Sequence, residues 1–64
     1  MVDYMWDGKE ITAIQAKTKY MNAGIRAGHD PDELNAIWNV ALDSEEARDT
    51  IFEVSEYHLE IDVD

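Results

Sequence analysis

The sequence has 64 residues with fifteen acidic and five basic side chains, a net charge of −10 and no cysteine. A chain of this length forms one domain at most, near the lower size limit for a stable core, and it has little room for an enclosed active site. The absence of cysteine excludes disulfides and thiolate metal sites, and the negative charge argues against direct binding to nucleic acids or anionic membranes. No apolar stretch approaches the roughly 18 residues of a membrane span, and no basic segment followed by an apolar run opens the chain, so we expect a cytoplasmic protein.

The first residues predict a short strand followed by a tight turn. Val2, Tyr4 and Trp6 alternate with Asp3, Met5 and Asp7, and this two-residue period is typical of a half-buried strand. Asp7-Gly8 is a dipeptide that a type I′ hairpin turn prefers. The sequence leaves open whether residues 9–11 return as a second strand or only lead into the next helix.

A first helix is predicted from about residue 13 to residue 23. Thr12 and Gln15 have the spacing of a capping box at its start, and Gly24 is expected to end it as a left-handed residue. The expected apolar stripe is Ile14, Met21 and Ile25, with Ala13, Ala16 and Tyr20 beside it.

The start of a second helix carries the clearest signal in the sequence. Asp30 supplies a side-chain acceptor at the N-cap, and Pro31 has a backbone angle that suits the first helical position. Glu33 at the third helical position is expected to bond back to the cap. The core-facing stripe that follows is Leu34, Ile37, Trp38, Ala41 and Leu42.

A third helix is expected after a very short turn. Either Ser44 alone, or Asp43 together with Glu46, caps this helix, which reaches about Glu56. Its expected inner face is Ala47, Ile51 and Phe52, extended by Val54 or Ser55.

From residue 57 the apolar period changes from 3.6 to 2, which predicts a final half-buried strand. Its inward residues are expected to be Tyr57, Leu59, Ile61 and Val63. An isolated strand cannot satisfy its backbone groups, so we expect it to pair with residues 2–6, in parallel or antiparallel. The predicted fold is a single small α+β domain over residues 1–64, in the order β-α-α-α-β, with three short helices on one face of the sheet.

No residue pattern indicates catalysis, a metal or a cofactor. Ser55 and His58 are the only close nucleophile and base, but no glycine-rich elbow accompanies them, and we expect ordinary surface residues. Residues 29–33 contain one imidazole and several carboxylates, yet they match no metal motif, and the helix cap already explains Asp30. We therefore expect a protein that is not an enzyme.

The negative charge is concentrated in the second half of the chain. Residues 1–29 contain three acidic and four basic residues, whereas residues 30–64 contain twelve acidic residues and only Arg48 as a base. Acidic residues at three- and four-residue steps predict an exposed stripe on the third helix, which the polar face of the last strand extends. The candidate protein-binding residues are Glu46, Asp49, Glu53, Glu56, Glu60 and Asp62.

Three hypotheses explain this charge. In the first, the acidic face docks on a basic protein, and one version is a small inhibitor or regulator that imitates a nucleic acid toward a nucleic-acid-handling protein, of the kind that mobile genetic elements encode. In the second, the charge serves only solubility or adaptation to salt. In the third, the chain is an assembly subunit that self-associates, for example as a homodimer, through the edge of its terminal strand.

Overall fold

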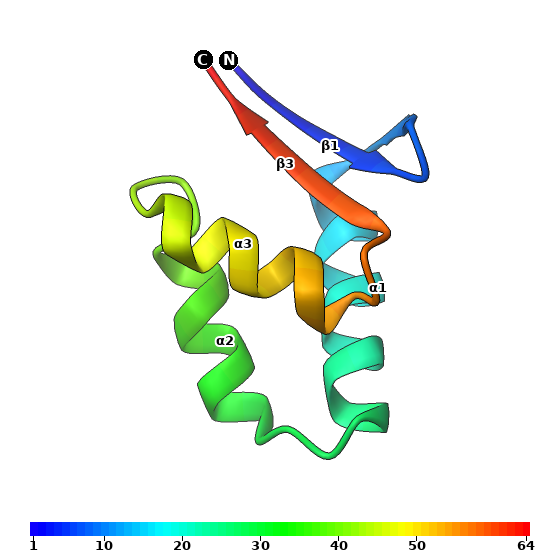
Figure 1. The fold of residues 1–64 in the computed structure, drawn as a ribbon, viewed down its shortest axis with the longest axis vertical. Helices are drawn as coiled ribbons and strands as arrows, with labels where there is room; N and C mark the ends of the chain where they lie inside the picture. The colour runs from blue at the N-terminus through cyan, green and yellow to red at the C-terminus, as the bar shows by residue number, and fades with distance from the viewer.

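Strand β1 (Val2–Trp6) is the centre of a three-stranded antiparallel sheet, with β2 (Lys9–Ile11) and β3 (Leu59–Val63) at its edges. This arrangement comes from a computed structural model, which describes all of residues 1–64. The helices are α1 (Ala13–Arg26), α2 (Pro31–Asn39) and α3 (Glu45–Val54). All three lie on one side of the sheet, and the two chain ends lie together at one end of it (Figure 1). The predicted α+β class and element order are confirmed.

The hairpin between β1 and β2 answers the question that the sequence left open. Asp7 and Gly8 have φ angles of 53° and 83°, and the left-handed conformation at both positions is that of a type I′ turn. Trp6 pairs with Lys9 directly across the turn. Residues 9–11 therefore return as a strand, β2, which pairs with β1 at one edge of the sheet.

The pairing of the terminal strands is antiparallel, with Val2 opposite Val63. The backbone N–H of Asp7 donates to the His58 carbonyl over 3.0 Å, and the N–H of Asp64 donates to the Met1 carbonyl over 3.1 Å. Because bonded and non-bonded pairs alternate in an antiparallel ladder, the even-numbered residues of β3 bond to β1. The backbone groups of the odd-numbered residues therefore point to the open side of β3.

The start of α1 is as predicted, but its end is not. Thr12 and Gln15 make both bonds of the capping box, over 3.0 and 3.1 Å. The helix continues to Arg26, and Gly24 lies inside it, where an added Cβ would stand 2.4 Å from Leu34 Cδ1. The left-handed residue that ends α1 is Gly28, with φ 93°. The prediction for Gly24 was wrong because this glycine is needed for close helix packing rather than for a turn.

The buried face of α1 also differs from the predicted stripe. Ile14 and Ile25 are 81% and 50% exposed, so neither belongs to the core. The side that faces the rest of the domain consists of Ala16, Tyr20 and Gly24, and the predicted Met21 packs beside them, partly buried. Two small residues beside one tyrosine let α2 approach α1 closely, whereas the bulkier stripe would have held the helices apart.

Tyr20 links the two helices at the centre of the core. Its side chain is fully buried, its hydroxyl donates to the Leu34 carbonyl over 2.8 Å, and its ring stacks on Trp38. Burial, and secondarily the nearby Glu33 carboxylate, raises the pKa of Tyr20 to about 12. The hydroxyl is therefore held in its neutral, donating form.

Helix α2 begins where the sequence predicts, but the expected bond from Glu33 back to the cap does not form. The Asp30 carboxylate accepts from the Asp32 N–H over 2.9 Å, and Leu34 is fully buried behind it. The helix ends at Asn39, before the last residues of the predicted stripe. Leu42 is consequently 46% exposed, so the prediction that it faces the core was wrong.

Helix α3 is capped by Ser44, whose hydroxyl accepts from the Ala47 N–H over 3.1 Å. It ends at Val54 because Glu56 and Tyr57 both have left-handed φ angles, 60° and 67°. Tyr57 is thus 68% exposed and lies outside β3, which corrects the prediction that the inward residues of the strand begin there. No helix of the chain combines the length and the apolar composition that crossing a membrane requires.

Candidate protein-binding surface

Helix α3 presents its predicted acidic stripe to solvent. Glu46, Asp49 and Glu53 are all exposed, on the side opposite the buried Ala47 and Ile51. Glu56 is exposed too, but it follows the end of the helix and adopts a left-handed conformation. The regular helical part of the stripe therefore has three carboxylates, and Glu56 continues it from the turn.

The outer face of the sheet is a second acidic area, which no helix covers (Figure 1). Tyr4 and Ile61 pack toward the core, so the alternate residues of the same strands point outward. Asp62 lies there directly opposite Asp3, and Glu60 lies opposite Met5. On the other side of Met5, β2 contributes Glu10. Four carboxylates thus surround one methionine.

No base of the strands neutralises this face. Lys9, the only basic residue in the three strands, pairs with Trp6 and therefore shares the helix side of the sheet. The only contact between a carboxylate and a basic side chain joins Asp7 to His58, away from these carboxylates. Like charges directly opposite each other, as at Asp3 and Asp62, destabilise an antiparallel pair by several tenths of a kcal/mol.

A groove of about 340 Å³ lies between α3 and β3 and connects the two acidic areas. Its lining consists of Glu45, Arg48, Asp49, Phe52, Glu60, Ile61, Asp62 and Val63. The guanidinium of Arg48 donates to the carbonyls of Ala41 and Leu42, over 2.8 and 3.3 Å. Because Arg48 is held by the turn before α3, it forms no ion pair with the acidic residues of the groove.

The structure groups the candidate residues differently from the simple stripe. Asp49 joins Glu60 and Asp62 along the groove, whereas Glu46 and Glu53 are outside its lining. Three further acidic residues belong to the same surface and were not predicted from the sequence: Asp3, Glu10 and Glu45. Glu45 precedes Asp49 by one helical turn, and that spacing could have identified it. Glu10 is placed only when residues 9–11 are assigned to the sheet, and Asp3 only when the register of β1 and β3 is known.

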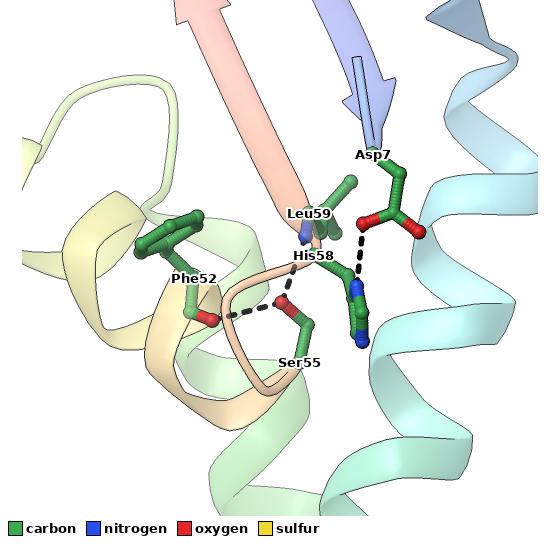
Figure 2. Close-up of polar contacts among 5 residues, drawn as sticks. All are labelled: Asp7, Phe52, Ser55, His58 and Leu59. Carbon is green, nitrogen blue, oxygen red and sulfur yellow. Dashed lines mark hydrogen bonds and ion pairs between the residues drawn. The ribbon is translucent and has the colours of Figure 1, made fainter. Parts of the chain in front are cut away.

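Ser55 and His58 do not form a nucleophile and base pair (Figure 2). The Ser55 hydroxyl donates to the Phe52 carbonyl and accepts the Leu59 N–H, both over 2.9 Å. His58 turns instead to Asp7 and stacks on Trp6, with 5.0 Å between ring centroids. Ser55 is only 1% exposed, so the expectation of a surface serine was wrong and its role is to join α3 to β3.

No group of three or more histidine and carboxylate side chains is arranged to hold a metal ion. No protein family, curated protein or solved structure matches the chain. The candidate site is therefore defined by its geometry and charge alone: two acidic areas, on α3 and on the outer face of the sheet, with a groove between them.

Proposed function

We propose that the protein is a non-catalytic binding module that docks the acidic surface of α3 and β3 on a basic protein. The observation that carries this proposal is that Asp49 on α3 and Glu60 and Asp62 on β3 border the same groove and form no ion pair. Such a field attracts a basic partner over several ångströms and accelerates its association.

Folding stability does not account for these charges. The opposed Asp3 and Asp62, and Asp49 and Glu53 one turn apart on α3, each cost a few tenths of a kcal/mol through repulsion. A 64-residue domain has only about 3 to 10 kcal/mol of stability in total. Retaining several unfavourable pairs in so small a domain supports a role outside folding.

The partner class that suits this surface is a protein that itself handles nucleic acid. Such proteins carry basic surfaces for phosphate groups, and an exposed series of carboxylates offers them a similar distribution of negative charge. In this version the protein acts as a small inhibitor or regulator that occupies the nucleic-acid site of its partner.

Affinity capture from native cell extract tests the proposal with charge-matched variants. Asp49→Lys with Glu53→Lys should abolish partner capture and leave the free energy of unfolding unchanged or higher. Asp32→Lys with Asp43→Lys makes the same change in net charge away from the surface and should retain capture. Equal capture by the two double variants would show that net charge, rather than this surface, governs binding.

The nucleic-acid-mimic version makes a stricter prediction about competition. Heparin or duplex DNA should displace the protein from its partner, and the affinity should fall steeply as salt increases. Binding that neither competitor nor salt affects would exclude mimicry while leaving a protein-binding role in place.

A second candidate function is self-assembly, for which the unpaired outer edge of β3 supplies free backbone groups although the charge on that strand opposes it. It predicts a mass in solution that increases with protein concentration. Sedimentation equilibrium that gives the monomer mass over the whole concentration range would remove it.

A further inference from the structure

The outer edge of β3 offers a short row of free backbone groups. The odd-numbered residues of β3 turn their N–H and carbonyl groups away from β1, as the bonds at Asp7 and Asp64 establish. The Leu59 N–H is already taken by the Ser55 hydroxyl. The remaining groups are the Leu59 carbonyl and both groups of Ile61 and of Val63, which are what an added strand needs.

The groove beside this edge can receive the side chains of such a strand. Ile61, Val63 and Phe52 supply its apolar lining, and Glu45 and Asp49 lie on its α3 side. At the start of β3, where the chain leaves α3, the Leu59 N–H is bonded to the Ser55 hydroxyl and is not available to an added strand (Figure 2). The open length thus runs from the Leu59 carbonyl to Val63.

The negative charge on β3 determines which residues an added strand should carry. The side chains of Glu60 and Asp62 project from β3 onto the outer face of the sheet, where no base opposes them. An added strand would place the Cβ atoms of its outward side chains about 5 Å from those of Glu60 and Asp62. Lysine or arginine at alternate positions is therefore favoured, and aspartate or glutamate is disfavoured.

A second copy of the chain fits this edge poorly. If β3 paired with itself around Ile61, Glu60 of each copy would stand opposite Asp62 of the other, with no base between them. Each copy also carries a net charge of −10, which opposes close approach. The charge on β3 therefore disfavours self-pairing, a common use of negative charge on an exposed edge.

We infer that the open edge of β3 binds an extended, basic segment of the partner as a fourth, antiparallel strand. Its basic side chains lie over Glu60 and Asp62, and its apolar side chains enter the groove between β3 and α3. This inference rests on the proposed function and adds to it the conformation and the residue pattern of the bound segment.

Synthetic peptides with alternating lysine and valine provide the test. A peptide of about seven residues, Lys-Val-Lys-Val-Lys-Val-Lys, covers β3 at roughly 3.3 Å per residue. In the antiparallel arrangement, valines lie opposite Ile61 and Val63 and donate their N–H groups to β3, whereas lysine N–H groups point away. Methylating the valine nitrogens removes these bonds, and methylating the lysine nitrogens does not, although both peptides keep the same charge.

We expect the lysine-methylated peptide to bind like the parent, and the valine-methylated peptide to bind at least tenfold more weakly, because two or more backbone bonds are lost. Hydrogen exchange at the Ile61 and Val63 amides should slow in the complex. Weaker binding of the lysine-methylated peptide alone would overturn the antiparallel arrangement, because the lysine N–H groups make the bonds to β3 only in a parallel one. Equal affinity of the two methylated peptides would overturn strand addition altogether, while the proposed docking of the acidic surface would stand.

A variant of the protein tests the same edge from the other side. Val63→Pro removes one outward N–H and blocks the edge, but leaves the bonds to β1 intact, so the unfolding free energy should stay close to that of Val63→Ala. Peptide binding should be lost in the proline variant and retained in the alanine variant. Retained binding to Val63→Pro, or slow exchange at Ile61 in a concentration-dependent dimer without peptide, would overturn the inference.

Discussion

The bond between the Ser55 hydroxyl and the Leu59 amide predicts a specific loss of stability in Ser55→Ala. Both residues are essentially inaccessible, at 1% and 0% exposure, so water does not replace the missing oxygen. The Phe52 carbonyl keeps a second donor, because the Tyr57 N–H bonds to it over 2.8 Å. The Leu59 N–H has no such alternative. The penalty is therefore that of one buried, unsatisfied amide, about 1–3 kcal/mol.

Urea denaturation followed by tryptophan fluorescence measures this loss. The denaturation midpoint should fall while the slope with urea stays unchanged, and the melting temperature should fall by about 4–8 °C per kcal/mol. Thr50→Ala is a matched control, because its hydroxyl donates to the Glu46 carbonyl on the exposed side of α3 and its removal orphans no buried group. A Ser55→Ala variant as stable as Thr50→Ala would refute the reasoning.

Three further predictions concern stability. Since the pKa of Tyr20 rises from 10.0 unfolded to about 12 folded, stability should fall between pH 10 and pH 12, and less so in Tyr20→Phe; parallel pH profiles from urea denaturation would contradict this. Residues 56 and 28 both have left-handed backbone angles, which glycine adopts more easily than other residues. Glu56→Gly should therefore raise the unfolding free energy by about 0.5–1 kcal/mol, and Gly28→Ala should lower it by about 1–2 kcal/mol. Calorimetric changes of the same sign in the two variants would contradict the left-handed conformation at one of these positions. Asp3→Lys should stabilise the chain by up to about 1 kcal/mol by removing repulsion from Asp62, and a gain that persists in high salt would exclude this cause.

The elements whose signals are local could be predicted from the sequence. The capping box at Thr12, the cap at Asp30 and the Asp7-Gly8 turn each depend on residues within a few positions, and the structure confirms all three. Gly24 could not be interpreted in this way. Whether a glycine ends a helix or admits a neighbouring helix depends on Leu34, ten positions further along and on another element.

The candidate surface could be predicted only in part, for the same reason. The exposure of Glu46, Asp49 and Glu53 follows from the helical period and the buried Ala47 and Ile51. The groove between α3 and β3 depends on how these elements pack, and no spacing in the sequence expresses that. The outward direction of Asp3 follows from strand alternation, but its position opposite Asp62 requires the register of the terminal strands.

The pairing of β1 with β3 also determines when the domain can fold. Val2 meets Val63, so this pairing closes a loop of almost the whole chain, whereas each helix needs only neighbouring residues. While a ribosome makes the chain from its N-terminus, β1 and β2 alone form an isolated hairpin, which is marginally stable at best in water. Tyr4 and Trp6 therefore gain a complete sheet only when β3 has emerged, and the domain acquires its core and its acidic edge at the same moment.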